Sequence, residues 1–309
     1  MVGTVRFSIQ ENMARPESWP EFARACEQDG FEALLVPDHP GACAEPFATL
    51  AAAAAVTERI RLGTNVINGG LWEPLPLAVA TATLDLLSAG RFDLGVGAGH
   101  NPFEWSMRGA ERPAPGARVE RMIELTAHTR ALLAGETVSA AGGHFTLRDA
   151  VLTSPRPVQP RVPLRVGGNN TRLLRYAAAH ADIIDFTGLG RTLADGRDHE
   201  TRWRAAHIDE QVERVRTAVD AAGRRPVFEA LVQYLEITDD AEAVAARMAA
   251  EVTGATARDL LDAPYVLIGT LDELRAEVLA HRKRWGFASF VIRGAHRAEA
   301  ARLLAALPG

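Results

Sequence analysis

Asp38, His39 and His100 have side chains that could transfer protons, and each follows a predicted strand. Asp38 and His39 come directly after a buried run that ends at Val36. An imidazole exchanges a proton near neutral pH, and a neighbouring carboxylate can orient it or a ligand. We therefore predict Asp38, His39 and His100 as catalytic residues. For Asp38 and His39, a turn between Pro37 and Pro40 is the competing interpretation.

Two glycine-containing segments could bring backbone amides close to a flat or anionic ligand. Residues 62–72 read LGTNVINGGLW, and residues 95–102 read GVGAGHNP. Glycine permits this close approach because it has no Cβ atom. The second segment is not a dinucleotide-binding fingerprint, since no helix of the right pattern opens immediately and Pro102 interrupts the chain. By composition alone, both segments are also compatible with ordinary loops.

A further segment, Gly167-Gly168-Asn169-Asn170, leads directly into a predicted helix at 173–179. Glycines before a helix, with asparagine as the cap, leave N–H groups and the positive end of the helix dipole available to a ligand. A phosphate fits this position, which is the usual phosphate side of a barrel. An ordinary turn with a well-capped helix is the alternative.

The elements that must position these residues alternate between strands and helices. About eight short β-branched or aliphatic runs are separated by longer segments of helical period, which favours a parallel sheet. Eight repeats in this length predict an α/β fold of the (β/α)8 TIM-barrel class rather than an open sheet. We treat residues 1–309 as one domain. The candidate strands are 5–9, 33–36, 60–66, 92–96, 164–166, 183–186, 227–237 and 288–292.

Two segments depart from a plain strand–helix unit, and two helix starts are recognisable. Residues 137–163 contain Gly142-Gly143 between β-like stretches, which predicts an inserted hairpin followed by an extended loop. Residues 188–207 form a long polar stretch and are a candidate lid. Helix starts of the S/T-x-x-E type occur at Ser18 with Glu21 and at Thr270 with Glu273.

Composition limits the classes of partner. The chain has 34 basic and 39 acidic residues and a net charge of −5, without a basic stripe, so we expect no nucleic-acid partner. No long uncharged apolar stretch and no signal-peptide pattern is present, and we expect a soluble cytoplasmic protein without a membrane partner. Cys26 and Cys43 lie outside any metal-binding motif, and we predict reduced thiols and no metal site.

Taken together and in order, five motifs resemble the bacterial-luciferase-like monooxygenase family over nearly the whole chain. The motifs are PDH at 37–39, RIRLGTNV at 59–66, LDLLSAGRFDLGVGAGHN at 84–101, PRPVQPRVPLRVGGNNTRLLRYAAAHAD at 155–182, and PYVLIGTLDELRAEVLAHR at 264–282.

This resemblance implies a TIM barrel that binds FMN or the deazaflavin coenzyme F420 in its mouth. His39, paired with Asp38, would be the proton donor or a substrate contact beside the ring. The peptide bond between Asn65 and Val66 would be cis and would support the ring's face. Gly167 to Asn170 would hold the phosphate. The candidate cofactor-binding residues are Asn65, Val66, Asn68, Ala98, Gly99, Gly167, Gly168, Asn169 and Asn170.

The same resemblance leaves the reaction open between three functions. We favour an F420-dependent oxidoreductase that transfers hydride to or from a small organic substrate. Lys283 is the only lysine beside 33 arginines, a usage that resembles actinobacteria, in which F420 is widespread. The alternatives are an FMN-dependent two-component monooxygenase and a noncatalytic flavin-binding paralogue. The sugar-phosphate dehydrogenase branch has a glutamate where His100 stands. Similar proteins are commonly dimers, so a homodimer is possible, but the sequence leaves the oligomeric state open.

Overall fold

The computed structural model describes residues 5–12, 18–193 and 199–307. The chain divides into two compact units. Unit 1 comprises Met1–Glu11, Gln28–Ala33 and Gly167–Gly309, and unit 2 comprises Asn12–Glu27 and Leu34–Val166. Whether residues 1–309 behave as one domain stays a prediction.

The main sheet has the strand order of a (β/α)8 barrel. Among the described residues its order is β3-β2-β1-β15-β12-β9-β8-β5-β4, with an additional pairing of β3 with β5. Short β4 follows β3, so the two count as one barrel strand, and helices connect successive strands. The fold class predicted from the sequence is therefore confirmed. The sheet strands are β1 (Arg6–Gln10), β2 (Ala33–Val36), β3 (Arg61–Thr64), β4 (Ile67–Asn68), β5 (Phe92–Gly97), β8 (Leu164–Gly167), β9 (Ile183–Phe186), β12 (Val227–Val232) and β15 (Phe287–Arg293).

In unit 2, β3, β4 and β8 each pair in parallel with β5. Proline begins several of its helices, where a missing N–H costs nothing because no helical partner exists for it. Glu45, for example, caps α2 by accepting a hydrogen bond from the backbone N–H of Ala48 at 2.6 Å. The helices are α1 (Trp19–Gln28), α2 (Pro46–Ala54), α3 (Pro74–Leu87), α4 (Pro102–Ser106) and α5 (Pro115–Ala134).

In unit 1, β15 pairs in parallel with β1 and β12, and β12 pairs with β9. The capping box predicted at Thr270 and Glu273 is present and begins α10. Gly286 ends this helix at a φ of 80°, a conformation that glycine adopts without a steric penalty. The helices are α6 (Thr171–His180), α7 (Ala205–Ala221), α8 (Ala241–Ala249), α9 (Ala257–Asp262), α10 (Leu271–Trp285), η2 (Gly294–His296) and α11 (Arg297–Ala306).

The prediction of one strand at 227–237 is wrong. The segment forms β12 and then β13 (Tyr234–Ile237), which leaves the main sheet and pairs in parallel with β14 (Val266–Gly269). Between them, the backbone N–H of Gln233 donates to the carbonyl of Tyr265 at 2.7 Å. This hydrogen bond starts the new pairing, and the sequence VFEALVQYLEI, which is mostly apolar, does not reveal such a change of partner.

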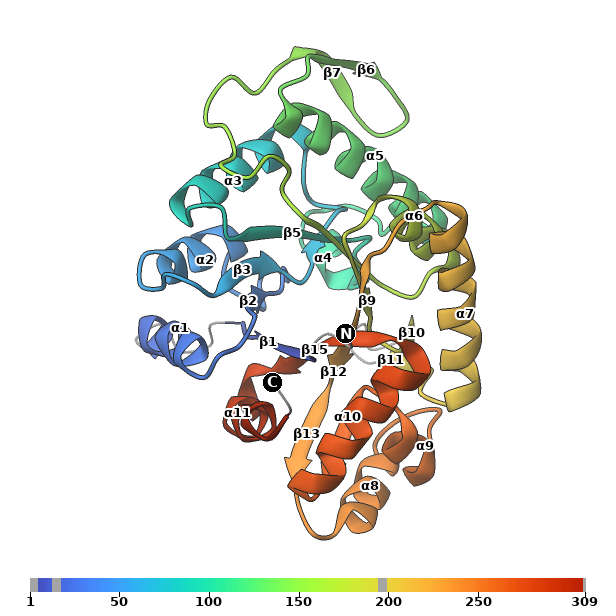
Figure 1. Cartoon of the computed structure of the whole chain (residues 1–309). Coiled ribbons are helices and arrows are strands. Elements are labelled where there is room, and N and C mark those ends of the chain that lie inside the picture. Colours follow the sequence, from blue (N-terminus) through green and yellow to red (C-terminus); the bar gives the residue numbers. More distant parts are fainter. Residues whose placement is uncertain (1–4, 13–17, 194–198, 308–309) are drawn as a thin grey trace. The chain divides into compact units, whose positions relative to one another are not determined.

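The predicted insertion at 137–163 contains a hairpin. Strands β6 (Val138–Ala141) and β7 (Thr146–Ala150) pair antiparallel. In Figure 1 the hairpin lies beside α5, where Glu124 accepts hydrogen bonds from the backbone N–H groups of His144 and Phe145. The candidate lid at 188–207 includes the antiparallel strands β10 (Leu189–Thr192) and β11 (His199–Thr201). Residues 194–198 of this lid lie outside the described residues, and its closure stays a prediction.

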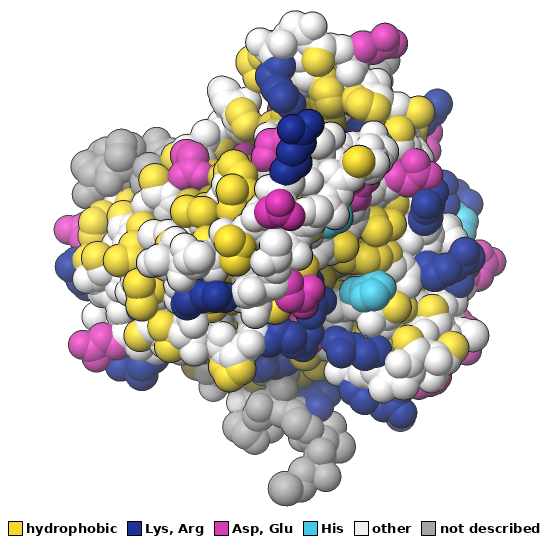
Figure 2. Space-filling view, turned by 90° about the horizontal axis from the view of Figure 1, so that it is seen from above, with side chains coloured by type: hydrophobic (Ala, Val, Ile, Leu, Met, Phe, Trp, Pro, Cys, Tyr) yellow, Lys and Arg dark blue, Asp and Glu magenta, His cyan; other side chains and the backbone are white. Residues whose placement is uncertain are grey.

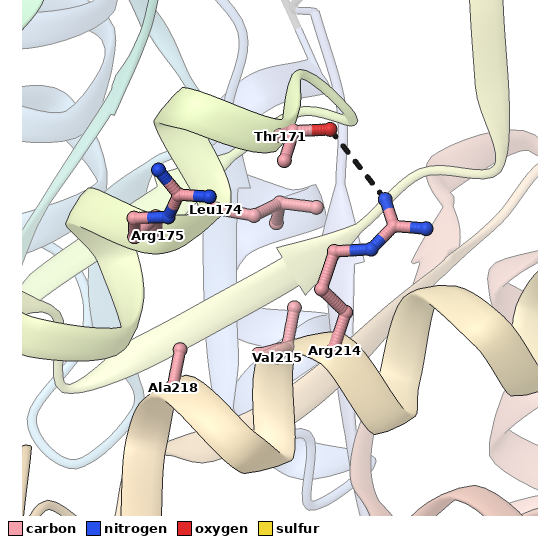
Figure 3. A pocket seen from close by; sticks show the side chains of 6 residues that line it. All are labelled: Thr171, Leu174, Arg175, Arg214, Val215 and Ala218. Carbon is pink, nitrogen blue, oxygen red and sulfur yellow. Dashed lines mark hydrogen bonds between the residues drawn. The ribbon is translucent and has the colours of Figure 1, made fainter. Parts of the chain in front are cut away.

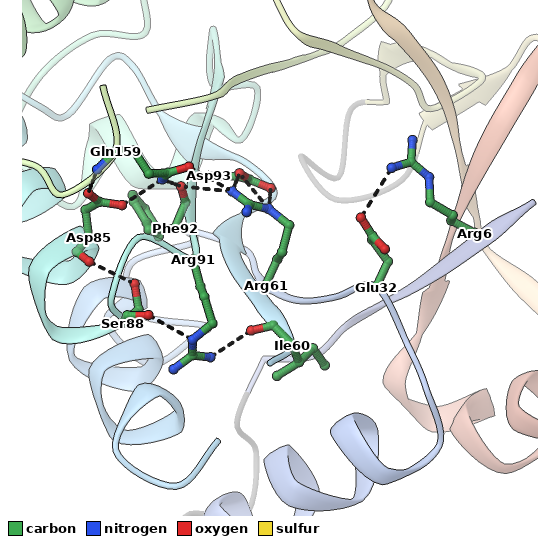
Figure 4. Close-up of polar contacts among 10 residues, drawn as sticks. All are labelled: Arg6, Glu32, Ile60, Arg61, Asp85, Ser88, Arg91, Phe92, Asp93 and Gln159. Atoms are coloured by element: carbon green, nitrogen blue, oxygen red, sulfur yellow. Dashed lines mark hydrogen bonds and ion pairs between the residues drawn. The ribbon is translucent and has the colours of Figure 1, made fainter. Parts of the chain in front are cut away.

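Polar side chains connect loops of the chain to neighbouring strands and helices. The Asp85 carboxylate accepts hydrogen bonds from the backbone N–H groups of Val158 and Gln159, at 2.7 and 3.0 Å, and from the Gln159 side chain. The guanidinium of Arg61 pairs with Asp93 (Figure 4). In unit 1, Arg6 pairs with Glu32 at 3.2 Å. The Asp85 contacts satisfy the N–H groups of the loop at Val158 and Gln159, whereas the two arginine contacts are ion pairs between side chains.

Hydrophobic side chains gather over the left part of the face in Figure 2. Helix α3 of unit 2 exposes Val79, Leu86 and Leu87, with exposed fractions of 39%, 54% and 59%. The homodimer stays a prediction.

No helix among the described residues is both long enough and apolar enough to cross a membrane.

Glu27, near the end of α1, connects this helix to the chain that enters β3. Its carboxylate accepts hydrogen bonds from the backbone N–H groups of Glu58, Arg59 and Ile60, at 3.0, 2.6 and 2.9 Å. Burial by itself raises the pKa of Glu27, but these three donors outweigh it and hold the pKa below the ordinary 4.5. A carboxyl whose pKa is lowered by folding stabilises the folded state when it is ionised.

We predict that Glu27→Gln lowers the free energy of unfolding by about 1–2 kcal/mol at neutral pH, because the three N–H donors that meet on Oε2 lose a charged acceptor and keep at most a neutral one. The wild-type chain loses this contribution as the pH falls below 4.5 and through the lowered pKa, so the two proteins converge in acid. Denaturant unfolding at several pH values measures the difference. Glu73→Gln is the control, since its side chain is 60% exposed. A difference that stays constant down to acidic pH would contradict the assignment.

Candidate active site

Asp38 follows β2 and is buried, with 5% of its surface exposed. Its Oδ2 accepts hydrogen bonds from the backbone N–H of Asn68 at 3.1 Å and from the Trp72 indole at 2.9 Å. Burial raises the pKa of Asp38, and the nearby negative charge of Glu104 raises it further, while the two donors oppose this shift. Asp38 therefore holds a proton at a higher pH than a surface aspartate does.

His39 extends from the same loop but remains partly exposed. The N–H groups of Ala42 and Cys43 both donate to its carbonyl, at 2.9 and 2.8 Å, which closes a turn around it. Its Nδ1 lies 2.6 Å from Oε1 of Glu104. The Glu104 side chain is 1% exposed and that of His39 is 34% exposed. The buried Glu104 carboxylate thus holds the imidazole at Nδ1, while part of the ring remains exposed.

Asn68 connects these two acids. Its backbone N–H binds Asp38, and its side-chain amide donates to the second oxygen of Glu104. Its own Oδ1 accepts a hydrogen bond from the N–H of Gly70 at 2.9 Å. Four residues from three separate segments of the chain therefore form one network in unit 2: Asp38, His39, Asn68 and Glu104.

His100 follows β5 and packs edge-on against His39, with 5.3 Å between the ring centroids. The structure thus brings the three predicted catalytic residues Asp38, His39 and His100 into one part of unit 2. The carbonyl of His100 accepts a hydrogen bond from Arg112, and that of Gly99 accepts one from Arg118.

The peptide bond between Asn65 and Val66 is cis, as the resemblance to the family implies. Asn65 is buried, and its N–H donates to the carbonyl of Val36 at 2.9 Å, next to the loop that carries Asp38 and His39. Asn65, Val66 and Asn68 therefore lie in the same part of unit 2 as the two histidines. Their contact with a cofactor stays a prediction, as does that of Ala98 and Gly99.

Gly99 allows the loop after β5 to lie close to the network. Its φ is 72°, and a Cβ at this position would lie 2.0 Å from Oδ1 of Asn68 and 2.6 Å from the Trp105 ring. Any larger residue would therefore displace the amide that binds Glu104. Glycine here permits the loop to pack against Asn68, in addition to any contact with a ligand.

Glu104 is the residue that sequence reasoning missed. Pro102 was expected to interrupt the chain, but it begins the short helix α4, with Asn101 as the cap. Asn101 accepts a hydrogen bond from the N–H of Phe103 at 3.0 Å. An asparagine followed by proline at the first helical position is a helix start, and this signal places Glu104 on a helix beside His100.

In unit 1, Gly167 to Asn170 lead into α6 as predicted. Asn170 caps the helix by accepting hydrogen bonds from the N–H groups of Arg172 and Leu173, at 2.9 and 3.3 Å. Asn169 is held by the Thr187 hydroxyl, which its amide binds at 3.0 Å, and by Gln211, which donates to it at 3.0 Å. This segment belongs to the other compact unit, and phosphate binding there stays a prediction.

A small pocket between α6 and α7 lies beside this helix start (Figure 3). It is lined by Thr171, Leu174, Arg175, Arg214, Val215 and Ala218. The Arg214 guanidinium reaches the Thr171 hydroxyl, at 3.5 Å, on the first residue of α6. The start of α6 thus has a cation within reach in addition to its own dipole, and both favour an anion.

The structure is a (β/α)8 barrel in which a buried polar network in unit 2 contacts His39. The sequence model of the luciferase-like monooxygenase family matches residues 4–289. The chain belongs to this family, which confirms the resemblance seen in the sequence motifs.

Three relatives show what the chain is similar to. An F420-dependent glucose-6-phosphate dehydrogenase of Beutenbergia cavernae is 38% identical over 176 residues, which are 54% of this chain and 52% of the relative. The match thus spans about half the length of that dehydrogenase. An F420-dependent secondary alcohol dehydrogenase, solved with an F420-acetone adduct, has a TM-score of 0.78 at 18% identity, with 98% of each chain covered. A Baeyer-Villiger monooxygenase of Pseudomonas putida with FMN has a TM-score of 0.74 at 14% identity, covering 99% of this chain and 100% of that one.

We predict that Gly99→Ala destabilises unit 2 more than Gly109→Ala does. Both glycines have a similar positive φ, 72° and 69°, so both substitutions carry the same backbone penalty of about 1–2 kcal/mol. Only at Gly99 does the new Cβ meet other atoms, whereas nothing lies within 4 Å at Gly109. The difference in unfolding free energy, measured with denaturant, should be about 1–3 kcal/mol. Equal losses would show that Gly99 does not pack against the network.

Proposed function

We propose that the chain is an F420-dependent oxidoreductase that transfers hydride to or from a small organic substrate. The observation that carries this proposal is the pair of imidazoles in unit 2. His39 and His100 pack against each other beside a buried network that contains Asp38 and Glu104. Such a pair can deliver or remove the proton that must accompany hydride transfer at a carbon atom.

The residues present fit a coenzyme with a flat ring and a phosphate. In unit 2, Gly99 lets the loop after β5 pack against Asn68, and the N–H of Asn65 donates to the carbonyl of Val36, next to the loop that carries His39. In unit 1, Thr171 is the first residue of α6, so its N–H has no partner within the helix, and the Arg214 guanidinium lies near the Thr171 hydroxyl. We propose that Asn65, Val66, Asn68, Ala98 and Gly99 bind the ring, and that Gly167, Gly168, Asn169 and Asn170 bind the phosphate.

When bound, F420 supplies a carbon that accepts or donates a hydride, and the remaining chemistry falls to the protein. His39 holds the proton and transfers it to or from the substrate oxygen. His100 contacts the substrate on the neighbouring side. Asp38, buried and bound by Trp72 and Asn68, fixes the loop that carries His39.

The relatives support F420 over FMN. The dehydrogenase of Beutenbergia cavernae and the secondary alcohol dehydrogenase both carry F420 in their names. The neighbour with FMN supports the second candidate, an FMN-dependent monooxygenase that requires a separate reductase. A noncatalytic paralogue is disfavoured because Asp38, His39 and His100 are all present. We do not propose glucose 6-phosphate as the substrate, since the match to that dehydrogenase spans only about half of its length.

We predict that the purified protein binds F420 more tightly than FMN. Titration followed by absorbance and fluorescence measures both affinities. We then expect a small alcohol to change the absorbance of oxidised F420 bound to the protein, and a small carbonyl compound to change that of reduced F420. Neither reaction should consume oxygen. Tighter binding of FMN, with oxygen consumed only when reduced FMN and substrate are both present, would identify the monooxygenase instead.

We predict that His39→Ala lowers turnover by about 10²–10⁴-fold while the affinity for F420 stays nearly unchanged, because a general acid–base contributes to the reaction rather than to ground-state binding. Steady-state kinetics and the same titration measure the two effects. His144→Ala, at an exposed position of the hairpin, is the control and should keep full activity. Unchanged turnover in His39→Ala would remove His39 from the reaction.

A further inference from the structure

The hydrogen bonds of unit 2 form a chain that fixes the direction of each donor, and this chain ends at His39. We infer that Glu104 is a positioning residue that holds His39 in the tautomer protonated at Nδ1, so that Nε2 is the atom that exchanges the proton. This inference rests on the proposed function for its catalytic consequence, but the tautomer itself can be observed in the protein without coenzyme.

The first step is unambiguous because it starts at the backbone. The N–H of Gly70 can only donate, and it binds Oδ1 of Asn68 at 2.9 Å. The oxygen of the Asn68 amide therefore faces Gly70, and its NH₂ group faces the other way. Without such a partner, the side-chain amide of an asparagine could rotate by half a turn and exchange the positions of its oxygen and its NH₂ group.

The second step passes this direction to Glu104. The Asn68 NH₂ group donates to Oε2 of Glu104. Oε1 of the same carboxylate faces Nδ1 of His39 at 2.6 Å. An ionised carboxylate offers only acceptors, so both neighbours must be donors. The donor on the histidine is then Nδ1–H, and the neutral ring keeps Nε2 free of a proton.

Burial makes this arrangement strict. The Glu104 side chain is 1% exposed, so water does not compete for its two oxygens. The nearby titratable groups on the surrounding loops are Asp38 and Cys43, and the negative charge of Glu104 raises the pKa of both. Among the described residues, neither Asp38 nor Cys43 donates a hydrogen bond to Glu104, and neither contacts Nδ1 of His39.

The chain offers a matched pair elsewhere. In α10, Nε2 of His281 lies 3.0 Å from Oε1 of Glu277, and His281 is 6% exposed. This pair also joins a glutamate to a histidine, but here the histidine is buried, and the pair lies on one helix of unit 1 and outside the candidate site. Glu277→Gln therefore tests what the loss of a carboxylate does to a histidine in general.

The test is Glu104→Gln, which keeps the size of the side chain but replaces one acceptor with a donor. Because Asn68 and His39 both donate, the amide satisfies only one of them. Nitrogen-15 NMR of the full chain without coenzyme, with labelled histidine, reports the tautomer. We expect wild-type His39 to carry its proton on Nδ1, and Glu104→Gln to shift it to Nε2 or to a mixture. Glu277→Gln should leave the His39 signals unchanged. An unchanged His39 tautomer in Glu104→Gln would overturn the inference.

Kinetics supply the second readout. We expect Glu104→Gln to lower kcat by about 10²–10⁴-fold with little change in KM or in F420 affinity, as expected when a histidine takes the wrong tautomer. The pH profile of kcat should also change, whereas Glu277→Gln should match the wild type. A shifted tautomer with unchanged kcat would contradict the positioning role. If the wild type itself shows no turnover, the proposed function fails while the tautomer result stands.

A second variant tests the chain from its other end. Asn68→Asp keeps the acceptor for Gly70 but replaces the NH₂ group with an oxygen that faces the Glu104 carboxylate. Two facing acceptors cannot both be satisfied, so we expect the His39 signals to change here as well. If Glu104→Gln does not fold, this variant decides the question: an unchanged tautomer in Asn68→Asp would overturn the inference.

Discussion

The polar part of unit 2 depends on one constraint: a buried carboxylate, Glu104, must meet donors on both of its oxygens. Leaving a buried charged acceptor without a donor costs more than a hydrogen bond is worth, so the surroundings of Glu104 determine which way their own groups point. Asn68 is oriented by Gly70, Glu104 by Asn68, and His39 by Glu104. The close approach of Gly99 and Trp105 to Asn68 keeps the amide in this place.

Much of the fold could be predicted from the sequence because its periodicity follows directly from burial. The runs at 33–36 and 183–186 coincide with β2 and β9, and the capping box at Thr270 forms as expected. The break at Gln233 could not be predicted in this way. Both β12 and β13 are apolar and extended, and only the pairing of β13 with β14, a contact distant in sequence, separates them.

In the candidate site, too, some features could be predicted from the sequence and others could not. Asp38, His39 and His100 follow strands of a parallel barrel, and that position alone predicts that they gather at one edge. Glu104 was missed because a proline was interpreted as an interruption, although proline is well tolerated at the first position of a helix. The direction of the hydrogen bonds was beyond any sequence pattern, because it depends on which oxygen of a carboxylate faces which neighbour. Residues 167–170 were predicted as a capped helix start, and that local structure is present.

The most direct test of the account is a crystal structure of the protein with F420. The account predicts that the deazaflavin ring lies against the Asn65–Val66 peptide with Nε2 of His39 facing its reactive edge, and that the phosphate binds the N–H groups at the start of α6. A coenzyme bound elsewhere, or a ring whose reactive carbon lies away from both His39 and His100, would contradict the central claim.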